Sequence, residues 1–253
     1  MERRLASWPA AAPAAAGLIA ATLAAWVLVL WPVLDMHGAL ARLMMPHGAA
    51  WNMANLVAVF LMWSVMMAAM MLPGAMPMLL LYDRLVRRAE GAARRTGLFV
   101  AAYLALWTLF SLGATLAQWG LHTALLLTPM GRSTSPALTA ALFLVAGLYQ
   151  FTPMKRACLT GCRSPLGFLT TEWRGGDWGA LVMGLRHGIL CVGCCWALMA
   201  LVFVGGTMNL MWMAVLTLAV TLEKLAFGGR WFDAGLGAAL FAAGLTCATL
   251  LAL

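Results

Sequence analysis

The residues best suited to chemistry form a short run of thiols with one imidazole. Cys191, Cys194 and Cys195 lie within five residues, and His187 precedes them by about one helical turn. At about 100° per residue, a helix places these four side chains within roughly 100° of arc. Three thiols and an imidazole on one face could bind a soft metal ion. Because cysteine is also a small hydrophobe that is often buried, simple packing is the alternative.

A second cysteine pair, Cys158 and Cys162, lies in a segment that also contains Lys155 and Arg156. If a helix continues through Gly161, the i, i+4 spacing puts both thiols on one face. Neighbouring positive charges favour the thiolate form. The alternative is that these charges belong to an ordinary cytoplasmic loop and that the two cysteines are incidental.

Methionine is abundant, with 19 residues, and several follow helical spacing. Met62, Met66 and Met70 form one i, i+4 line, and Met67 with Met71 forms a parallel one. Such lines could pass a monovalent soft ion along thioether sulfurs, although methionine more often fills gaps in cores.

A further group of soft donors, Met36, His37 and His47, falls in the first loop that we expect outside the cell. Mixed histidine and methionine groups can capture copper. At a membrane interface they can equally be polar anchors, so both interpretations stay open. Glu223 and Lys224 end an apolar run, where ionisable residues are paired, functional or snorkelling to the surface.

Composition decides which class of protein positions these residues. The chain has 253 residues, of which 64% are hydrophobic and 9% charged. Soluble domains contain about 25% charged residues, so the composition indicates an integral membrane protein. The net charge of +8 is spread over short loops between apolar runs, which disfavours nucleic acid as a partner. No phosphate-binding loop, Ser/His/Asp arrangement or paired carboxylates appear, which disfavours hydrolases and nucleotide-driven pumps.

Apolar runs long enough to cross a bilayer of about 30 Å recur along the chain. They predict an all-α bundle with one domain over residues 1–253 and seven spans. The spans are expected at residues 14–34, 52–82, 97–119, 136–151, 178–204, 208–222 and 231–251.

The distribution of basic residues predicts the orientation of these spans. With the N-terminus cytoplasmic, the inside segments carry 13 Lys and Arg residues and the outside loops carry two, Arg42 and Arg132. Cytoplasmic loops carry such an excess, so we expect an inner (plasma) membrane protein with its C-terminus outside. No cysteine falls in an outside loop, which favours reduced thiols over disulfides.

Small residues recur every fourth position at Ala180, Gly184 and Gly188. This spacing lets membrane helices approach closely. The stripe predicts helix packing within the bundle, with a contact between protomers of an oligomer as the alternative.

Several short motifs together resemble one uncharacterised family. They are Met66–Pro73, Pro153–Pro165, Gly193–Met199, Gly206–Asn209 and Glu223–Lys224. The combination, spanning about residues 50–230, is similar to the family of predicted metal-binding integral membrane proteins termed the domain of unknown function DUF2182. The resemblance implies metal binding, which would fall on Cys158, Cys162, Cys191, Cys194 and Cys195.

The leading hypothesis is a membrane protein that binds or transfers copper, as Cu(I), with Zn(II) as the less favoured ion. Its partners would be the lipid bilayer and a metallochaperone or metalloenzyme. One alternative is a thiol–disulfide carrier that uses Cys191 and Cys194 and exchanges with Cys158 and Cys162, which would make the protein an enzyme. Another is a structural subunit of a membrane complex with inert cysteines.

Overall fold

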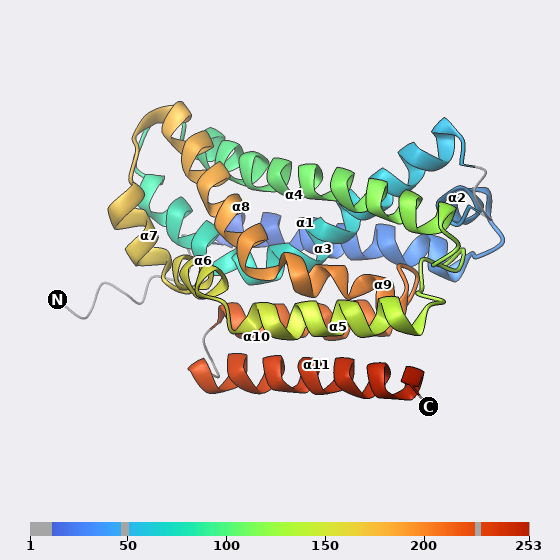
Figure 1. Cartoon of the computed structure of the whole chain (residues 1–253). Coiled ribbons are helices and arrows are strands. Elements are labelled where there is room, and N and C mark those ends of the chain that lie inside the picture. The colour runs from blue at the N-terminus through green and yellow to red at the C-terminus, as the bar shows by residue number, and fades with distance from the viewer. Residues whose placement is uncertain (1–11, 47–50, 226–228, 253) are drawn as a thin grey trace.

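The computed structural model describes residues 12–46, 51–225 and 229–252 (Figure 1). Within these ranges the chain is helical, with an isolated bridge between Leu127 and Ser133 and no strand. The predicted all-α class is therefore confirmed. The helices are α1 (Ala12–Leu34), α2 (Ala39–Met44), α3 (Met53–Val86), α4 (Ala92–Thr123), α5 (Pro136–Gln150), α6 (Pro153–Arg163), α7 (Pro165–Glu172), α8 (Gly176–Ala200), α9 (Val202–Gly205), α10 (Leu210–Lys224) and α11 (Gly229–Ala252).

Each of the seven expected spans coincides with a helix, but not every helix is long enough to cross a membrane. Five helical segments of the described chain have the required length and hydropathy: α1, α3, α4, α8 with α9, and α11. Helices α5 and α10 have 15 residues each. At 1.5 Å per residue they reach about 22 Å, short of a core of about 30 Å. If α5 and α6, bent by 66°, count together, the number is six. Seven spans are thus not confirmed.

The long helices run roughly side by side (Figure 1). Helix α3 packs between α1 and α4, α4 packs along α8, and α11 packs along α5. Helices α6 and α7 lie at one end of the bundle, whereas α2 and the loop 124–135 lie at the other. Helix α6 also packs against α8, which sets the geometry of the cysteines described below.

The stripe of small residues on α8 faces α4 in the same chain. A Cβ atom added at Gly184 would overlap the Phe99 carbonyl oxygen and lie 2.9 Å from the Ala102 Cβ. One added at Gly188 would lie 3.0 Å from the Leu106 Cβ. The packing interpretation is therefore confirmed. A contact between protomers through this stripe stays a prediction.

Because of this close approach, adding a methyl group should destabilise the protein at Gly184 but not at Gly113. Gly184→Ala should lower the free energy of unfolding by about 1–3 kcal/mol, because α8 must move away from the α4 backbone. Gly113→Ala is the matched control, since a Cβ there meets nothing within 4 Å. It should be neutral or stabilising by up to about 1 kcal/mol, because alanine favours the helix. Thermal unfolding in detergent measures both, and equal shifts would contradict the packing.

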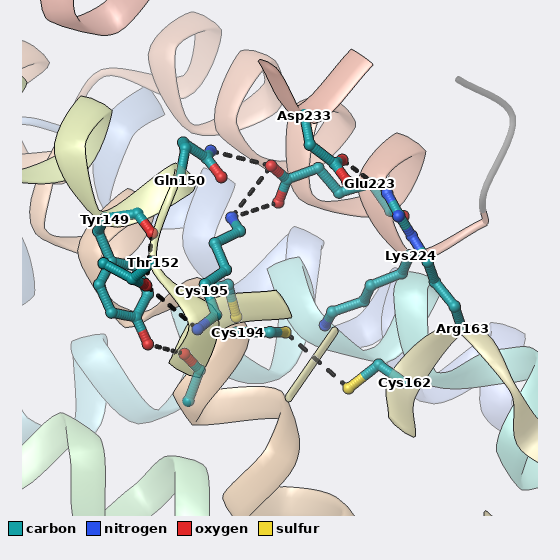
Figure 2. Close-up of polar contacts among 12 residues, drawn as sticks. Tyr149, Gln150, Thr152, Cys162, Arg163, Cys194, Cys195, Glu223, Lys224 and Asp233 are labelled. Carbon is teal, nitrogen blue, oxygen red and sulfur yellow. Dashed lines mark hydrogen bonds and ion pairs between the residues drawn. The ribbon is translucent and has the colours of Figure 1, made fainter. Parts of the chain in front are cut away.

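A buried ion pair fixes α6 against α10. The Lys155 ammonium donates to both Glu223 carboxylate oxygens, at 3.0 and 2.8 Å, and the two side chains are each 1% exposed (Figure 2). Gln150 donates to the same carboxylate at 2.9 Å. Arg163 donates to the Glu223 carbonyl and pairs with Asp233, so α11 joins the network. Of the alternatives that the sequence left open for Glu223, the structure shows pairing.

The ion pair should matter mainly when one partner is removed. Lys155→Met leaves the Glu223 carboxylate buried without its counter-ion, which should lower the free energy of unfolding by about 3–5 kcal/mol. The double variant Lys155→Met/Glu223→Met should recover most of that loss. Arg186→Met, which removes an exposed pair with Glu172, should cost about 0–1 kcal/mol. Unfolding curves of the three variants test this order, and a double variant no more stable than Lys155→Met would contradict it.

Candidate metal centre

Thiols from two helices and a thioether from a third meet inside the bundle. The Cys162 sulfur on α6 lies 3.9 Å from the Cys194 sulfur on α8, and the Cys195 sulfur lies 3.8 Å from the Met71 sulfur on α3. Cys191 lies on α8 between these pairs and neighbours the other three thiols. These five residues are called the sulfur cluster below. All are buried, and the cysteines are free thiols.

The α8 part of the cluster follows directly from helical spacing. Residues three and four apart share one face of a helix, which aligns Cys194 and Cys195 with Cys191. Their thiols donate to the Cys191 carbonyl oxygen at 3.1 and 2.8 Å. Cys191 lies near the middle of the Gly176–Gly205 segment, as the sequence predicted.

Helix α6 brings Cys162 to the cluster because its first turn is capped and because it packs closely against α8. The Thr152 side chain caps its first turn and Pro153 occupies its first position, where a missing N–H costs nothing. The helix continues through Gly161, where a Cβ would lie 2.7 Å from the Leu190 side chain. Cys158 and Cys162 therefore share a face toward α8, as predicted. Cys162 enters the cluster, whereas the half-buried Cys158 lies against Gly193.

A lysine and a tyrosine complete the surroundings of Cys191. The buried Lys224 ammonium lies 3.0 Å from the Cys191 sulfur and 3.7 Å from the Met71 sulfur. The Tyr103 hydroxyl lies 3.1 Å from the same Cys191 sulfur. Gly74 leaves room for the lysine stem, since a Cβ there would lie 2.9 Å from the Lys224 Cδ. Figure 2 shows Lys224 reaching toward the cysteines while Glu223 turns to the other side.

Three of these groups were not assigned to the site by sequence reasoning. Lys224 was recognised as ionisable but without a partner, and Met71 as part of a methionine line. Tyr103 carried no signal, because a single tyrosine in an apolar helix shows neither its depth nor its neighbour.

His187 occupies a different environment from the thiols. Its ring stacks on Tyr103 at 5.4 Å between centroids, and Phe99 and Phe168 lie 6.2 and 5.7 Å away. Its Nδ1 atom is buried without a hydrogen-bond partner in the described chain. The contacts of His187 are thus aromatic, and its role as a metal ligand remains a prediction.

The other predicted ligands lie apart from the sulfur cluster. Met66 and Met70 are buried, and Met66 borders a small cavity on the α1 side of α3. Met36 and His37 border a hollow at the α2 end of the bundle. His47 lies outside the described residues. Of the methionine line, it is Met71, next to Met70, that contacts the thiols.

The sulfur distances suit a soft ion with few ligands. In the ranges that the structure describes, no group of three or more His, Cys, Asp or Glu side chains is arranged to hold a metal ion. A metal–sulfur bond of about 2.3 Å would separate two ligands by roughly 3.8 Å in a tetrahedral site and 4.0 Å in a trigonal one. The Cys162–Cys194 and Cys195–Met71 separations match these values. The cluster therefore offers two ligand pairs at suitable distances.

Comparison with known proteins identifies a family. A family model described as "PpoB2: Copper chaperone" matches residues 60–247, about three quarters of the chain and all five residues of the sulfur cluster. No curated protein and no solved structure matches the chain. The match agrees with the expected association with a metal, whereas the DUF2182 label itself is not confirmed. By this match, the chain belongs to this copper chaperone family.

Proposed function

We propose that this protein is a multi-pass membrane copper chaperone that holds Cu(I) in the sulfur cluster. The observation that carries the proposal is the convergence of four thiols and one thioether from α3, α6 and α8 inside the bundle. Thiolate and thioether donors favour Cu(I) over hard ions, which take oxygen ligands. Membership of a copper chaperone family supports the same ion.

Charge also favours Cu(I) at this place. A Cu(I) ion held by two thiolates carries one negative charge, which is costly to bury unless it is balanced. The Lys224 ammonium, 3.0 Å from the Cys191 sulfur, supplies one positive charge. The neighbouring carboxylate, Glu223, is already bonded to Lys155. The site therefore combines soft donors with a cation that balances a bound Cu(I)–dithiolate.

The proposal places the bundle in the inner membrane with the α6 and α7 end in the cytoplasm. The long apolar helices support membrane insertion. The α6 and α7 end carries the loops richest in Lys and Arg, as cytoplasmic loops do. Cys158 lies on α6 with Cys162 and is half-buried against Gly193 of α8. It would then be the ligand that receives copper from the cluster before transfer to a metallochaperone or metalloenzyme.

The first test is metal analysis of the purified protein after loading with Cu(I) and removal of unbound metal. We expect about one tightly held copper per chain, and its loss in the variant Cys191→Ser/Cys194→Ser/Cys195→Ser, because serine oxygen is a hard, weak donor for this ion. Cys247→Ser, on α11 and outside the cluster, is the matched control and should retain copper. Equal and near-zero copper in wild type and triple variant would refute the proposal, and zinc in place of copper would correct the ion.

The second test addresses the balancing charge. Lys224→Met should weaken Cu(I) binding by about tenfold or more, because the bound complex then keeps a buried net charge. Lys224→Arg keeps the positive charge and should retain most of the affinity. Competition with a chromophoric Cu(I) chelator measures all three proteins. If the methionine and arginine variants bind equally well, the charge of Lys224 plays no part in binding.

A thiol–disulfide carrier is the second candidate function, and the separation of 3.9 Å between the Cys162 and Cys194 sulfurs favours it. The pair differs from the one that the sequence suggested, because Cys194 faces α6 while Cys191 faces Lys224. Burial of both thiols slows attack by external thiolates. A Cys162–Cys194 disulfide formed under mild oxidation, in a protein that retains no copper, would favour this function over copper binding.

A further inference from the structure

A large hollow opens at the end of the bundle that carries α2, far from the α6 end in Figure 1. Its volume is about 980 Å³. Soft donors from four separate segments line it: Met36, His37, Met45, Met130 and Met208.

A second, smaller cavity adjoins the hollow. It has a volume of about 120 Å³ and lies between α1, α2 and α3. Met44, Met62 and Met66 line it, together with Met208, which also borders the hollow. The two spaces therefore share a wall, and seven of the chain's 19 methionines line one or both.

Core packing accounts for part of the role of these methionines. Methionine is used in cores because its flexible side chain fills irregular gaps, and Met44, Met45, Met62, Met66 and Met208 are buried in the hydrophobic core. The same side chains also line the hollow or the small cavity, which packing alone does not require. An apolar residue such as leucine would line the same space equally well but would offer no sulfur.

Hydrogen bonds fix the parts of the wall that carry the methionines. The Thr207 backbone N–H and hydroxyl both donate to the Met130 carbonyl, at 2.9 and 3.1 Å, which joins the α4–α5 loop to the segment before α10. The Asn55 amide on α3 donates to the Leu43 carbonyl at 3.0 Å and so fixes the end of α2 beside Met45. The donors are therefore held on a scaffold rather than on a loose loop.

We propose that the hollow is a second Cu(I) site, which captures the ion at the α2 end, and that the small cavity leads it toward the sulfur cluster. The inference rests on the proposed function, because the cluster is the destination. From Met66, the i, i+4 position on the same face of α3 is Met70, and neighbours at this spacing lie about 5–6 Å apart. Met71 is the next residue after Met70 and lies about 100° further round the helix. Met71 itself contacts Cys195 in the cluster.

The two positive charges around the hollow oppose any cation, but they oppose Cu(I) less than a divalent ion. Arg42 and Arg132 line it along with the soft donors. Repulsion between an arginine and a cation grows with the charge of the cation, so a divalent ion is disfavoured twice as strongly as Cu(I). Neutral thioether and imidazole donors bind Cu(I) without needing a negative site.

The test separates capture from final binding. In the variant Met36→Leu/Met130→Leu/Met208→Leu, volume is nearly conserved but three of the four methionine sulfurs that line the hollow are lost, and only that of Met45 remains. After mixing with weakly complexed Cu(I), the absorbance of Cu(I)–thiolate bonds reports loading of the sulfur cluster. We expect loading about tenfold slower than in wild type, with final occupancy unchanged. The matched control Met78→Leu/Met199→Leu/Met213→Leu alters three buried methionines outside both cavities and should load at the wild-type rate.

Two further measurements keep the outcome decisive. His37→Asn, on an exposed side chain that cannot disturb folding through the core, should slow loading in the same direction. In the Cys191→Ser/Cys194→Ser/Cys195→Ser background, a weaker Cu(I) site should remain and should disappear when the three leucines are added. Loading at the wild-type rate in the leucine variant, or no residual site in the serine background, would overturn the capture site alone. Absence of any Cu(I)–thiolate signal in wild type would instead overturn the proposed function.

Discussion

Two adjacent residues of opposite charge on α10 impose the strongest constraint on this bundle. Glu223 and Lys224 are both buried, and neither charge is tolerable in an apolar interior without a partner. Successive positions on a helix point about 100° apart, so the two side chains must find separate partners. Glu223 bonds to Lys155 on α6, while Lys224 reaches Cys191 on α8. Helix α10 thereby contacts both helices that carry the thiols of the sulfur cluster.

The chemistry of the site follows from that arrangement. Once Lys155 is fixed against Glu223, α6 lies against α8, and Cys162 meets Cys194. Lys224 lies against the Cys191 thiol, where it would balance the charge of the proposed Cu(I)–dithiolate. A buried site made only of sulfur donors would retain a soft ion and exclude ions that depend on oxygen ligands or water.

The two groups of soft donors lie at different depths and differ in kind. The hollow at the α2 end offers thioethers and an imidazole to ions outside the bundle, whereas the cluster offers thiols in its interior. Neutral donors bind less tightly than thiolates, so copper that moves from Met208 toward Cys195 goes from weaker to stronger ligands. In the proposed pathway, such a gradient would direct loading without an energy source.

The sequence by itself determined the helices and the face on which each thiol lies, because hydropathy and the 100° turn are local properties. It placed Cys191, Cys194 and Cys195 together and Cys158 with Cys162, and all seven apolar runs are helices. Only the tertiary structure decided which helix lies opposite each face. It brought the Cys162 sulfur next to that of Cys194, and the Met71 sulfur, rather than that of Met66 or Met70, next to Cys195. It also placed the Lys224 ammonium beside Cys191 and the His187 ring among aromatic rings. It also showed α5 and α10 to be too short to span a bilayer alone. The spacing of residues in the sequence fixes the direction in which each side chain points from its own helix axis. Which side chain it then meets depends on how helices far apart in the sequence pack together.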